Sequence, residues 1–388
     1  MGLILLYSFR NLLRRRLTTF FTVLGMALVI FVFSAVIMLT EGLRQTLVKT
    51  GDYDNVMVIR RSSQAELQSV IDRTQANLIE TLDEIKIGSD GKRLVSKEVV
   101  TLISLNKKST GKPSNVTIRG IDSNSFKIRQ GIKIISGRLP TSGSNEIVVG
   151  KSIAKNFVDV ELGKYIYFGG RSWLVVGVFS AGNTGFSSEV WCDVNQLMQA
   201  FRRMAYSSVI FKLSDSRLFN KVKKKIESDP RFTLEAKREV KYYEEQSEVM
   251  ATFISYLGVS MTLIFSTGAI LGAMITMYTA VANRENEIGT LKAIGFSKKQ
   301  ILYAFLSESI LISLIGFFIG LFFSSFLQFY TISTLNWQTF SELAFTFSLT
   351  PKVIFYSLIF AISMGVSGGL LPALRASNKN IIEVLRTA

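Results

Sequence analysis

Residues 17–40 read LTTFFTVLGMALVIFVFSAVIMLT, a stretch of 24 residues without a charged side chain. As a helix with a rise of about 1.5 Å per residue it is about 36 Å long, enough to cross a hydrocarbon core of about 30 Å. The residues just before it are basic: Arg10, Arg14, Arg15 and Arg16. A secretory signal peptide shares this pattern, but the stretch is long and no small-residue cleavage site follows it. We therefore expect a retained membrane span.

Three more apolar stretches follow in the second half of the chain. Residues 249–283 carry no charge, residues 301–330 carry only Glu308, and residues 353–374 carry none. The first of these exceeds what one span needs, so its beginning is expected to continue as a helix outside the bilayer. Four spans place both termini on the same side of the membrane.

The flanking charges indicate which side that is. Residues 1–16 have a net charge of +4, residues 284–300 of +2 and residues 375–388 of +2. Basic flanks stay in the cytoplasm, so both termini and the 284–300 connection are predicted to be cytoplasmic. Residues 41–248 and the short 331–352 loop are then extracytoplasmic.

The composition excludes several classes of function. The chain has 388 residues, 48% of them hydrophobic, no histidine and a single cysteine, Cys192. Without histidine there is no Ser-His or Cys-His nucleophile and no histidine zinc site, and one cysteine cannot form a disulfide framework. The net charge of +16 is spread along the chain and not gathered into a patch interleaved with aromatic residues, which argues against a nucleic-acid partner.

The region 41–248 reads as a mixed α+β domain. Short runs rich in β-branched residues and bounded by turn residues predict strands at 56–60, 99–105, 116–121, 165–168, 173–179 and 207–213. Helical spacing predicts a helix within 64–87 and another after Asp215, so that the last strand begins a β-α-β unit. We expect two split halves around a small β-rich insertion at 137–185. The charged stretch 237–248 is expected to be a stalk helix that continues into the second span.

Catalytic and nucleotide-binding motifs are not found. The sequence has no Gly-x-Ser-x-Gly motif, no supported pair of carboxylates and no metal-ligand spacing. Gly111-Lys112 is followed by Pro113 and lacks the upstream glycine of a Walker loop. Energy for any uphill movement is therefore expected from another chain, and no cofactor is expected on this one.

The cytoplasmic connection 283–300 reads NRENEIGTLKAIGFSKKQ. Ile288, Leu291 and Ile294 are spaced to lie on one face of a short helix. From the residues alone, two interpretations stay open: an amphipathic connector that rests on lipid headgroups, and a docking helix for a partner.

A resemblance favours the second interpretation. The connection is followed by Ile301 and Glu308-Ser309, and together they resemble the signature of ABC permeases of the MacB-like group, which includes FtsX and the lipoprotein-releasing permeases. The matching residues in the connection are Arg284, Glu285, Glu287, Ile288, Gly289, Leu291, Ala293 and Gly295, and Lys292 lies among them. In that family the loop is the coupling helix that docks on an ATPase, so the resemblance implies an ATPase-coupling role for these residues.

Other segments resemble the same family along nearly the whole chain. The segments that resemble its periplasmic core are Glu146–Gly150, Gly163-Lys164 and Trp173–Val178. The C-terminal segments are Leu371-Pro372-Ala373, Arg375-Ala376 and Glu383-x-Leu385-Arg386. The fold implied is an α-helical membrane protein with four transmembrane helices and a large α+β extracytoplasmic domain, the MacB-type periplasmic core, between the first and second.

Several features have a structural explanation beside the functional one. Glu308, an acid within a span, is expected to be structural with a basic neighbour more readily than to serve transport. Gly268-x-x-x-Gly272 and Gly316-x-x-x-Gly320 suit either a dimer seam or packing within one chain. The phenylalanines crowding 317–329 are expected to face lipid, and Cys192 to be a small buried residue.

The expected function is that of a permease subunit of an ABC transporter in the bacterial inner membrane. It would couple ATP hydrolysis by a separate cytoplasmic ATPase, which holds ATP and Mg, to extracytoplasmic motion that exports or extracts a hydrophobic or amphipathic substrate such as a lipoprotein, lipid, peptide or drug. Expected partners are that ATPase, a second permease copy, the lipid bilayer, and a membrane-fusion adaptor with an outer-membrane channel. The alternative is an FtsX-like regulator of a cell-envelope enzyme; a membrane-bound hydrolase is disfavoured.

Overall fold

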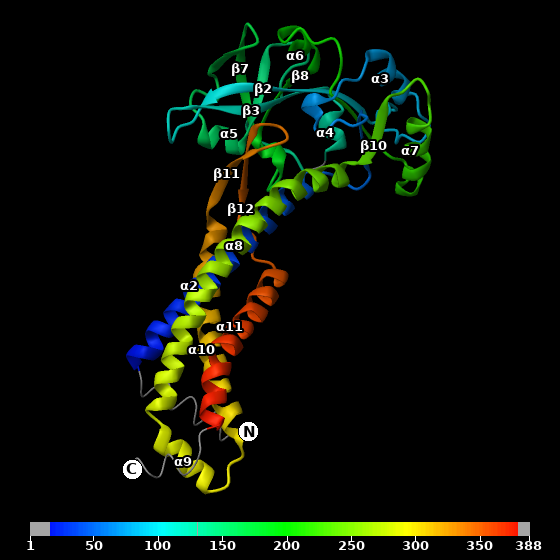
Figure 1. Ribbon diagram of the computed structural model, residues 1–388. Coiled ribbons are helices and arrows are strands. Elements are labelled where there is room, and N and C mark those ends of the chain that lie inside the picture. The colour runs from blue at the N-terminus through cyan, green and yellow to red at the C-terminus, as the bar shows by residue number, and fades with distance from the viewer. Residues whose placement is uncertain (1–15, 130, 379–388) are drawn as a thin grey trace. The chain divides into compact units, whose positions relative to one another are not determined.

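The computed structural model describes residues 16–129 and 131–378, which form two compact units (Figure 1). We call them the helical unit and the sheet unit. The helical unit comprises Phe253–Tyr330 and the described parts of Met1–Glu41 and Phe347–Ala388; the sheet unit comprises Gly42–Thr252 and Thr331–Thr346. The basic residues Arg10, Arg14 and Arg15 and the motif at Glu383, Leu385 and Arg386 lie outside the described residues.

Four helices in the described part of the chain are long and apolar enough to cross a membrane, which confirms the predicted number of spans. They are α2 (Arg16–Val48), α8 (Glu239–Ala282), α10 (Lys298–Ser325, extended by a 3-10 turn at Phe326–Phe329) and α11 (Pro351–Asn378). Helix α8 includes most of the predicted stalk, although Lys237 and Arg238 belong to the preceding strand.

Helices α10 and α11 approach closely because small residues face each other. Ser309 Oγ donates a hydrogen bond of 2.7 Å to the carbonyl of Gly365. A Cβ atom on Gly369 would lie 2.4 Å from Ser309 Cβ, and one on Gly365 would lie 2.4 Å from Ser313 Oγ. In lipid, where hydrophobic burial does not drive helices together, close backbone packing and hydrogen bonds do.

The two Gly-x-x-x-Gly motifs behave differently. Gly316 and Gly320 pack within the chain against α2, where a Cβ atom on Gly320 would lie 2.6 Å from the carbonyl oxygen of Ala27. Around Gly268 and Gly272 there is open space, with nothing within 4 Å of an added Cβ. Packing within one chain therefore explains the motif of α10 and not that of α8.

Most of the phenylalanines near the end of α10 are exposed on the helical unit, as expected for side chains that face lipid, and Phe317 is buried. Phe323, Phe326 and Phe329 border an apolar cavity of about 800 Å³ between α2 and α10.

The sheet unit is built on one ten-stranded sheet. Its order is β10 (Leu234–Arg238), β1 (Asn55–Arg60), β9 (Ser208–Lys212), β2 (Val95–Asn106), β3 (Pro113–Ile121), β8 (Glu189–Asp193), β5 (Glu146–Gly150), β7 (Arg171–Ser180) and β4 (Lys133–Gly137), with β6 (Tyr165–Phe168) also paired to β7. All six predicted strands are present. Strands β4, β5 and β10 were not among the predicted strands.

The first four strands of this order form two interlocked split β-α-β units. β1 is antiparallel to both β10 and β9, and β2 is antiparallel to β9. The crossover helix α7 (Phe219–Glu227) follows a turn in which Asp215 accepts from the backbone N–H of Arg217, as the sequence predicts. The two-half organisation is therefore right, with each half contributing a strand to the other.

The predicted helix within 64–87 is much shorter than expected. Only α3 (Arg73–Glu80) forms, begun by a capping box in which Asp72 and Gln75 bond each other's backbone. Before and after it the backbone pairs in isolated β-bridges, Ile71 with Tyr206 and Ile85 with Leu213. Ile71 and Ile85 are buried, as their helical spacing predicts, but they lie outside α3 and reach the core from extended chain.

The 331–352 connection is mostly a β-hairpin and not an irregular loop. Strands β11 (Thr331–Asn336) and β12 (Ser341–Thr346) pair antiparallel and belong to the sheet unit. The buried Glu342 of β12 pairs with Lys107 Nζ at 2.6 Å and accepts from Ser114 Oγ at 3.0 Å. These contacts, together with a hydrogen bond of 3.1 Å from the backbone N–H of Ala344 to Ser188 Oγ, hold the hairpin in the sheet unit.

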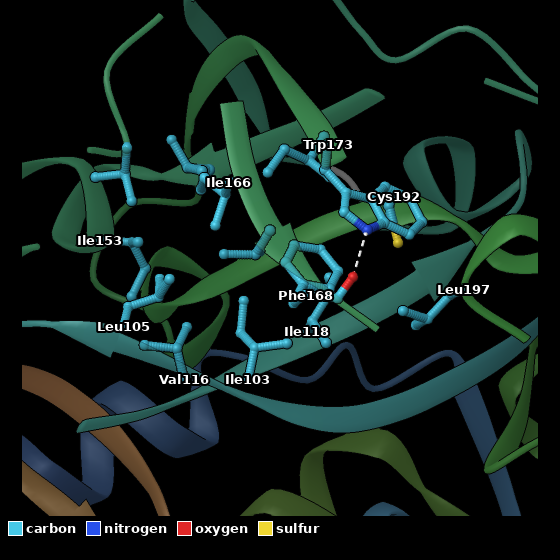
Figure 2. Close-up of a cluster of buried hydrophobic side chains, with 14 of the residues drawn as sticks. Ile103, Leu105, Val116, Ile118, Ile153, Ile166, Phe168, Trp173, Cys192 and Leu197 are labelled. Carbon is cyan, nitrogen blue, oxygen red and sulfur yellow. Dashed lines mark hydrogen bonds between the residues drawn. The ribbon is translucent and has the colours of Figure 1, made fainter. Parts of the chain in front are cut away.

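One hydrophobic core of the sheet unit surrounds Trp173, which stacks on Phe168 with ring centroids 4.9 Å apart (Figure 2). Trp173 Nε1 donates to the carbonyl of Phe168 at 3.2 Å. Cys192 is fully buried in the same core, as expected, and burial raises the pKa of its thiol. A second core lies among β1, β9, β10, α3 and α7.

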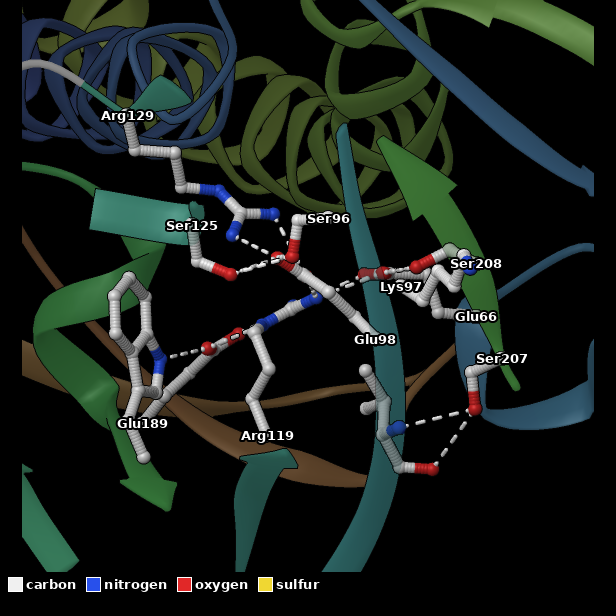
Figure 3. A network of polar contacts seen from close by, with 12 residues as sticks. Glu66, Ser96, Lys97, Glu98, Arg119, Ser125, Arg129, Glu189, Ser207 and Ser208 are labelled. Carbon is white, nitrogen blue, oxygen red and sulfur yellow. Dashed lines mark hydrogen bonds and ion pairs between the residues drawn. The ribbon is translucent and has the colours of Figure 1, made fainter. Parts of the chain in front are cut away.

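Between these cores the sheet unit holds a buried ionic network (Figure 3). Arg119 of β3 bonds three carboxylates at 2.7–2.8 Å, those of Glu66, Glu98 and Glu189. Arg129 bonds Glu98 through both terminal nitrogens and lies 3.4 Å from Glu239. Burial alone would raise the pKa of Glu98, but the guanidinium groups of Arg129 and Arg119 outweigh it and bring that pKa to about 2.

The network also perturbs two neighbouring acids. Burial raises the pKa of Glu239, against the opposing effect of Arg129. The pKa of Asp122 is raised to about 6, first by burial and then by the charge of Glu98. The carboxylate of Asp122 accepts from the backbone N–H groups of Lys97 and Asn124.

We expect Gly369→Ala to destabilise the helical unit by about 1–3 kcal/mol, because the added methyl group overlaps Ser309. The matched control is Gly25→Ala in α2, where the new methyl group meets open space and helix propensity improves. Thermal unfolding of the detergent-solubilised protein compares them. Equal melting temperatures for the two variants would contradict the close packing of α10 on α11.

We expect the stability of the protein to decrease as the pH rises through about 6, because the folded state favours the protonated form of Asp122, whose ordinary pKa is 3.8. This contribution is complete below pH 3.8 and lost above pH 6, whereas that of Glu98 is lost only as the pH falls from 4.5 toward 2. Melting temperatures measured from about pH 4.5 to pH 7 should converge with those of Asp122→Asn at low pH and fall below them at neutral pH. Parallel curves would show that Asp122 does not titrate in this range.

Candidate functional site

The candidate site is the connection between α8 and α10, whose centre is the short helix α9 (Glu285–Ala293). Its first turn carries Glu285 and Glu287 and its last turn Lys292, the charge order that stabilises a helix dipole. Gly295 then adopts φ +104°, a conformation that side chains rarely allow. Ser297 begins α10 with a capping box closed by Gln300.

One side of the connection is anchored inside the helical unit. Arg284 is 7% exposed and Glu308 of α10 is 5% exposed, and they form a bidentate pair with Nη1–Oε2 3.0 Å and Nη2–Oε1 3.4 Å. This supplies the basic neighbour that the sequence analysis expects for Glu308. Ile288 and Gly289 are also buried, Ile288 in the core of the helical unit.

A second anchor reaches α11. Lys292 Nζ donates to the backbone carbonyl of Ser377 at 2.9 Å. Partial burial, and next the nearby charge of Lys298, lower the pKa of Lys292. The carbonyl groups in the last turn of a helix lack partners within the helix, so this lysine also stabilises the end of α11.

The other side of the connection is exposed. Glu287, Ala293 and Gly295 are at the surface, and Glu285 and Leu291 are half-buried. Ile294 is 72% exposed and Phe296 is 41% exposed, beside the basic Lys298 and Lys299.

The predicted apolar face of Ile288, Leu291 and Ile294 is therefore divided and not continuous. The helix ends at Ala293, so Ile294 no longer follows helical spacing and turns outward while Ile288 packs inward. Of the predicted residues, Arg284, Ile288, Gly289 and Glu308 form the anchored side. The exposed apolar Phe296 was not among them, although an aromatic residue next to a glycine in the turn between two helices is a signal that could have found it.

The described residues hold no group of three or more histidine, cysteine, aspartate or glutamate side chains that could bind a metal. The carboxylates of the buried network are held by arginine instead. What the connection offers chemically is a rigidly held surface of exposed apolar, acidic and basic side chains, which suits contact with a protein.

Comparison with known protein families gives two matches. The MacB-like periplasmic core domain matches residues 19–229, and the FtsX-like permease C-terminal domain matches residues 259–381, which includes the connection. The predicted fold class is thereby confirmed: four long apolar helices, with a mixed α+β domain of periplasmic type between the first and second.

Individual relatives agree with these matches. The chain is 25% identical over 312 residues to YknZ of Bacillus subtilis, an uncharacterized ABC transporter permease, covering 75% of each protein. It is 24% identical over 374 residues to the macrolide export ATP-binding/permease protein MacB of Campylobacter jejuni, covering 85% of this chain and 56% of that one. Against a MacB protein of Chromobacterium violaceum it spans 43% of the relative, so it spans about half the length of these MacB proteins.

Two solved structures resemble part of the chain. The periplasmic region of MacB from Actinobacillus actinomycetemcomitans has a TM-score of 0.38 and 17% identity, covering 49% of this chain and 91% of that one. The extracellular domain of YknZ has a TM-score of 0.36 and 18% identity, covering 47% of this chain and 99% of that one. The first family match alone takes in more than half of the chain, so the protein belongs to the family that joins a MacB-like periplasmic core domain to an FtsX-like permease domain, and it is an ABC transporter permease of that family.

Proposed function

We propose that this permease couples ATP hydrolysis by a separate cytoplasmic ATPase to motion of its extracytoplasmic domain. The observation that carries the proposal is the division of the 284–300 connection into an anchored side and an exposed side. An exposed side gives a partner something to bind, and an anchored side passes the displacement on. The ATPase supplies ATP and Mg, and this chain supplies no catalytic group.

In this proposal some residues of the connection contact the ATPase and others transfer the movement to the neighbouring helices. Glu287, Leu291, Ala293 and Gly295 contact the ATPase, together with the exposed Ile294 and Phe296. Arg284 and Ile288 transfer the movement into α10 and the core of the helical unit, and Lys292 transfers it to α11. Because paired charges in a membrane protein are costly to separate, the Arg284–Glu308 pair keeps α9 and α10 moving together.

The membrane arrangement follows from the charges and spans. Both termini and the connection lie in the cytoplasm of a bacterial cell, and residues 41–248 and the hairpin lie outside. A second copy of the permease, identical or related, packs along α8. Support comes from Gly268 and Gly272, which line up on a surface whose neighbours Ile264, Leu271 and Ile275 are more than half exposed.

The transported substrate is hydrophobic or amphipathic: a lipoprotein, lipid, peptide or drug, handled with a membrane-fusion adaptor and, where the envelope has one, an outer-membrane channel. The name of the MacB relatives, macrolide exporters, supports this class. The alternative is a regulator that activates a cell-envelope enzyme by the same motion. The extracytoplasmic region of about 200 residues favours the transporter, because the regulators of this group are expected to have a smaller one.

We expect an ATPase and a second, differently tagged permease to copurify with the wild-type protein from gently extracted native membranes. The double variant Glu287→Lys, Leu291→Asp should lose the ATPase and keep the second copy, because it changes one exposed and one half-buried residue and leaves the Arg284–Glu308 pair and α8 unaltered. The control, Asp159→Lys with Met204→Asp, makes the same charge changes at exposed positions of the sheet unit and should keep both. Mass spectrometry identifies the partners, including an adaptor or a hydrolase.

Loss of the ATPase from the control as well, or its retention by the double variant, would contradict docking through this connection. Failure to recover the second copy from the wild type would contradict the dimer.

We expect Glu308→Gln to retain the ATPase but lose most of the stimulation of ATP hydrolysis by the permease, since the anchored side is then loosened. Arg284→Gln and Glu308→Gln should each lower the free energy of unfolding by about 3–5 kcal/mol, and the double variant by less than their sum. Ser357→Ala, which breaks the buried Ser34–Ser357 hydrogen bond of 2.8 Å in the same unit, is the control. Equal loss of stimulation in this control would assign the effect to general stability.

A further inference from the structure

The sheet unit contains a second concave surface that the proposed coupling function does not use. It is a groove of about 600 Å³ beside the turn of the β11–β12 hairpin. Five separate segments line it: the turn after β1 at 62–64, Gln68, strand β10, the start of α8, and the hairpin turn 337–340. Its volume falls within the range of about 300–1,000 Å³ typical of small-molecule sites.

Two aromatic side chains stand exposed at this groove. Trp337 is 45% exposed and Phe340 is 53% exposed. Phe340 adopts φ +53° and Ser62, also in the lining, φ +65°. A bulky residue with positive φ is held in place at a cost, and such conformations concentrate at functional sites. The hairpin turn therefore presents an aromatic side chain in a conformation that backbone preference alone disfavours.

The rest of the lining is rich in neutral amides. Gln64, Gln68, Gln246 and Gln338 all line the groove. Gln246 Nε2 bonds Tyr242 Oη at 2.6 Å, whereas Gln338 Oε1 is buried and has no hydrogen-bond partner in the structure. An amide offers both donors and an acceptor, and Gln64 and Gln68 are exposed at the groove.

The charges in the groove cancel almost completely. Its one lysine, Lys237, lies 3.3 Å from Glu235 and 2.9 Å from Glu245. With its cation neutralised and one carboxylate in excess, the groove disfavours an anionic ligand. Its amides and hydroxyls disfavour a lipid chain, which would leave them without partners.

We propose that this groove binds a neutral saccharide. A sugar ring has an apolar C–H face that stacks on an aromatic ring, and hydroxyl groups on its edge that both donate to and accept from amides. Trp337 and Phe340 supply the stacking surfaces, and the amides of the lining, Gln338 among them, supply hydrogen-bond donors and acceptors. The site lies on the extracytoplasmic domain, and its occupancy needs neither ATP nor the cytoplasmic partner.

The protein carries its own reporter for this test. Of its three tryptophans, Trp173 and Trp191 are fully buried and Trp337 is exposed. The full chain is purified in lauryldimethylamine oxide, a detergent without a sugar headgroup, and titrated with the neutral trisaccharide of N-acetylglucosamine. We expect a saturable blue shift of tryptophan fluorescence, and heat of binding in calorimetry.

Three variants make the test specific. Trp337→Ala and Gln338→Ala should each weaken binding measured by calorimetry, the first about tenfold or more. The control Tyr167→Ala removes an aromatic residue of the sheet unit that is 74% exposed and lies outside the groove, and it should bind as the wild type does. Unchanged melting temperatures show that the variants are folded.

Absence of any saturable signal up to about 10 mM trisaccharide would overturn the proposal, since the weakest specific sites bind near 1 mM. So would binding that Trp337→Ala leaves intact. A short extended peptide that shifts the fluorescence where the sugar does not would also overturn it, and would assign the groove to a peptide laid along edge strand β10.

Discussion

The sheet unit depends on the guanidinium group of Arg119, which is 1% exposed and meets three carboxylates from three different parts of the chain. Glu66 comes from the segment after β1, Glu98 from β2 and Glu189 from β8, so one side chain joins three separate segments of the sheet unit. These groups are removed from water, and an unpaired buried charge is far costlier than an unpaired exposed one. Loss of any one of them therefore destabilises the others.

Arg129 extends this constraint to the first residue of α8, since it shares Glu98 with Arg119 and reaches Glu239. Phe186 lies 4.6 Å from the Arg129 guanidinium carbon and adds a cation–π contact. The start of the long helix is therefore specified by charge and not by propensity alone. Asp122 shows the cost of this arrangement. Burial and the nearby charge of Glu98 keep this acid protonated to a higher pH than in water.

The sequence predicts the architecture well where one-dimensional patterns carry it. Three charge-free stretches and a fourth that carries only Glu308 identify four helices, and runs bounded by turn residues identify six strands. It fails where partners far along the chain decide the structure: Ile71 and Ile85 sit at helical spacing but pair with Tyr206 and Leu213. The hairpin was missed for the same reason. The buried Glu342 of β12 is paired with Lys107, which lies more than 200 positions earlier in the chain.

The candidate site was predictable as a segment but not as a surface. Spacing placed Ile288 and Ile294 together, and only the helix end at Ala293 separates a buried residue from an exposed one. That Arg284 faces Glu308, 24 positions further on, needed the three-dimensional arrangement. The groove at Trp337 gave no sequence signal, because its five segments come together only in the folded sheet unit.

The sheet unit is also discontinuous in sequence, and this has a consequence for biosynthesis. Its last strand, β12, ends at Thr346, whereas the rest of the unit ends at Thr252, so the two are separated by an intervening membrane hairpin of α8 and α10. At a synthesis rate of about 5–20 residues per second, the unit waits roughly 5–20 s for its final strand. During that interval Lys107 and the surface beside β3 lack their partner Glu342. The sheet unit is therefore complete only after α10 and the hairpin have been synthesised, which ties its folding to that of the helical unit.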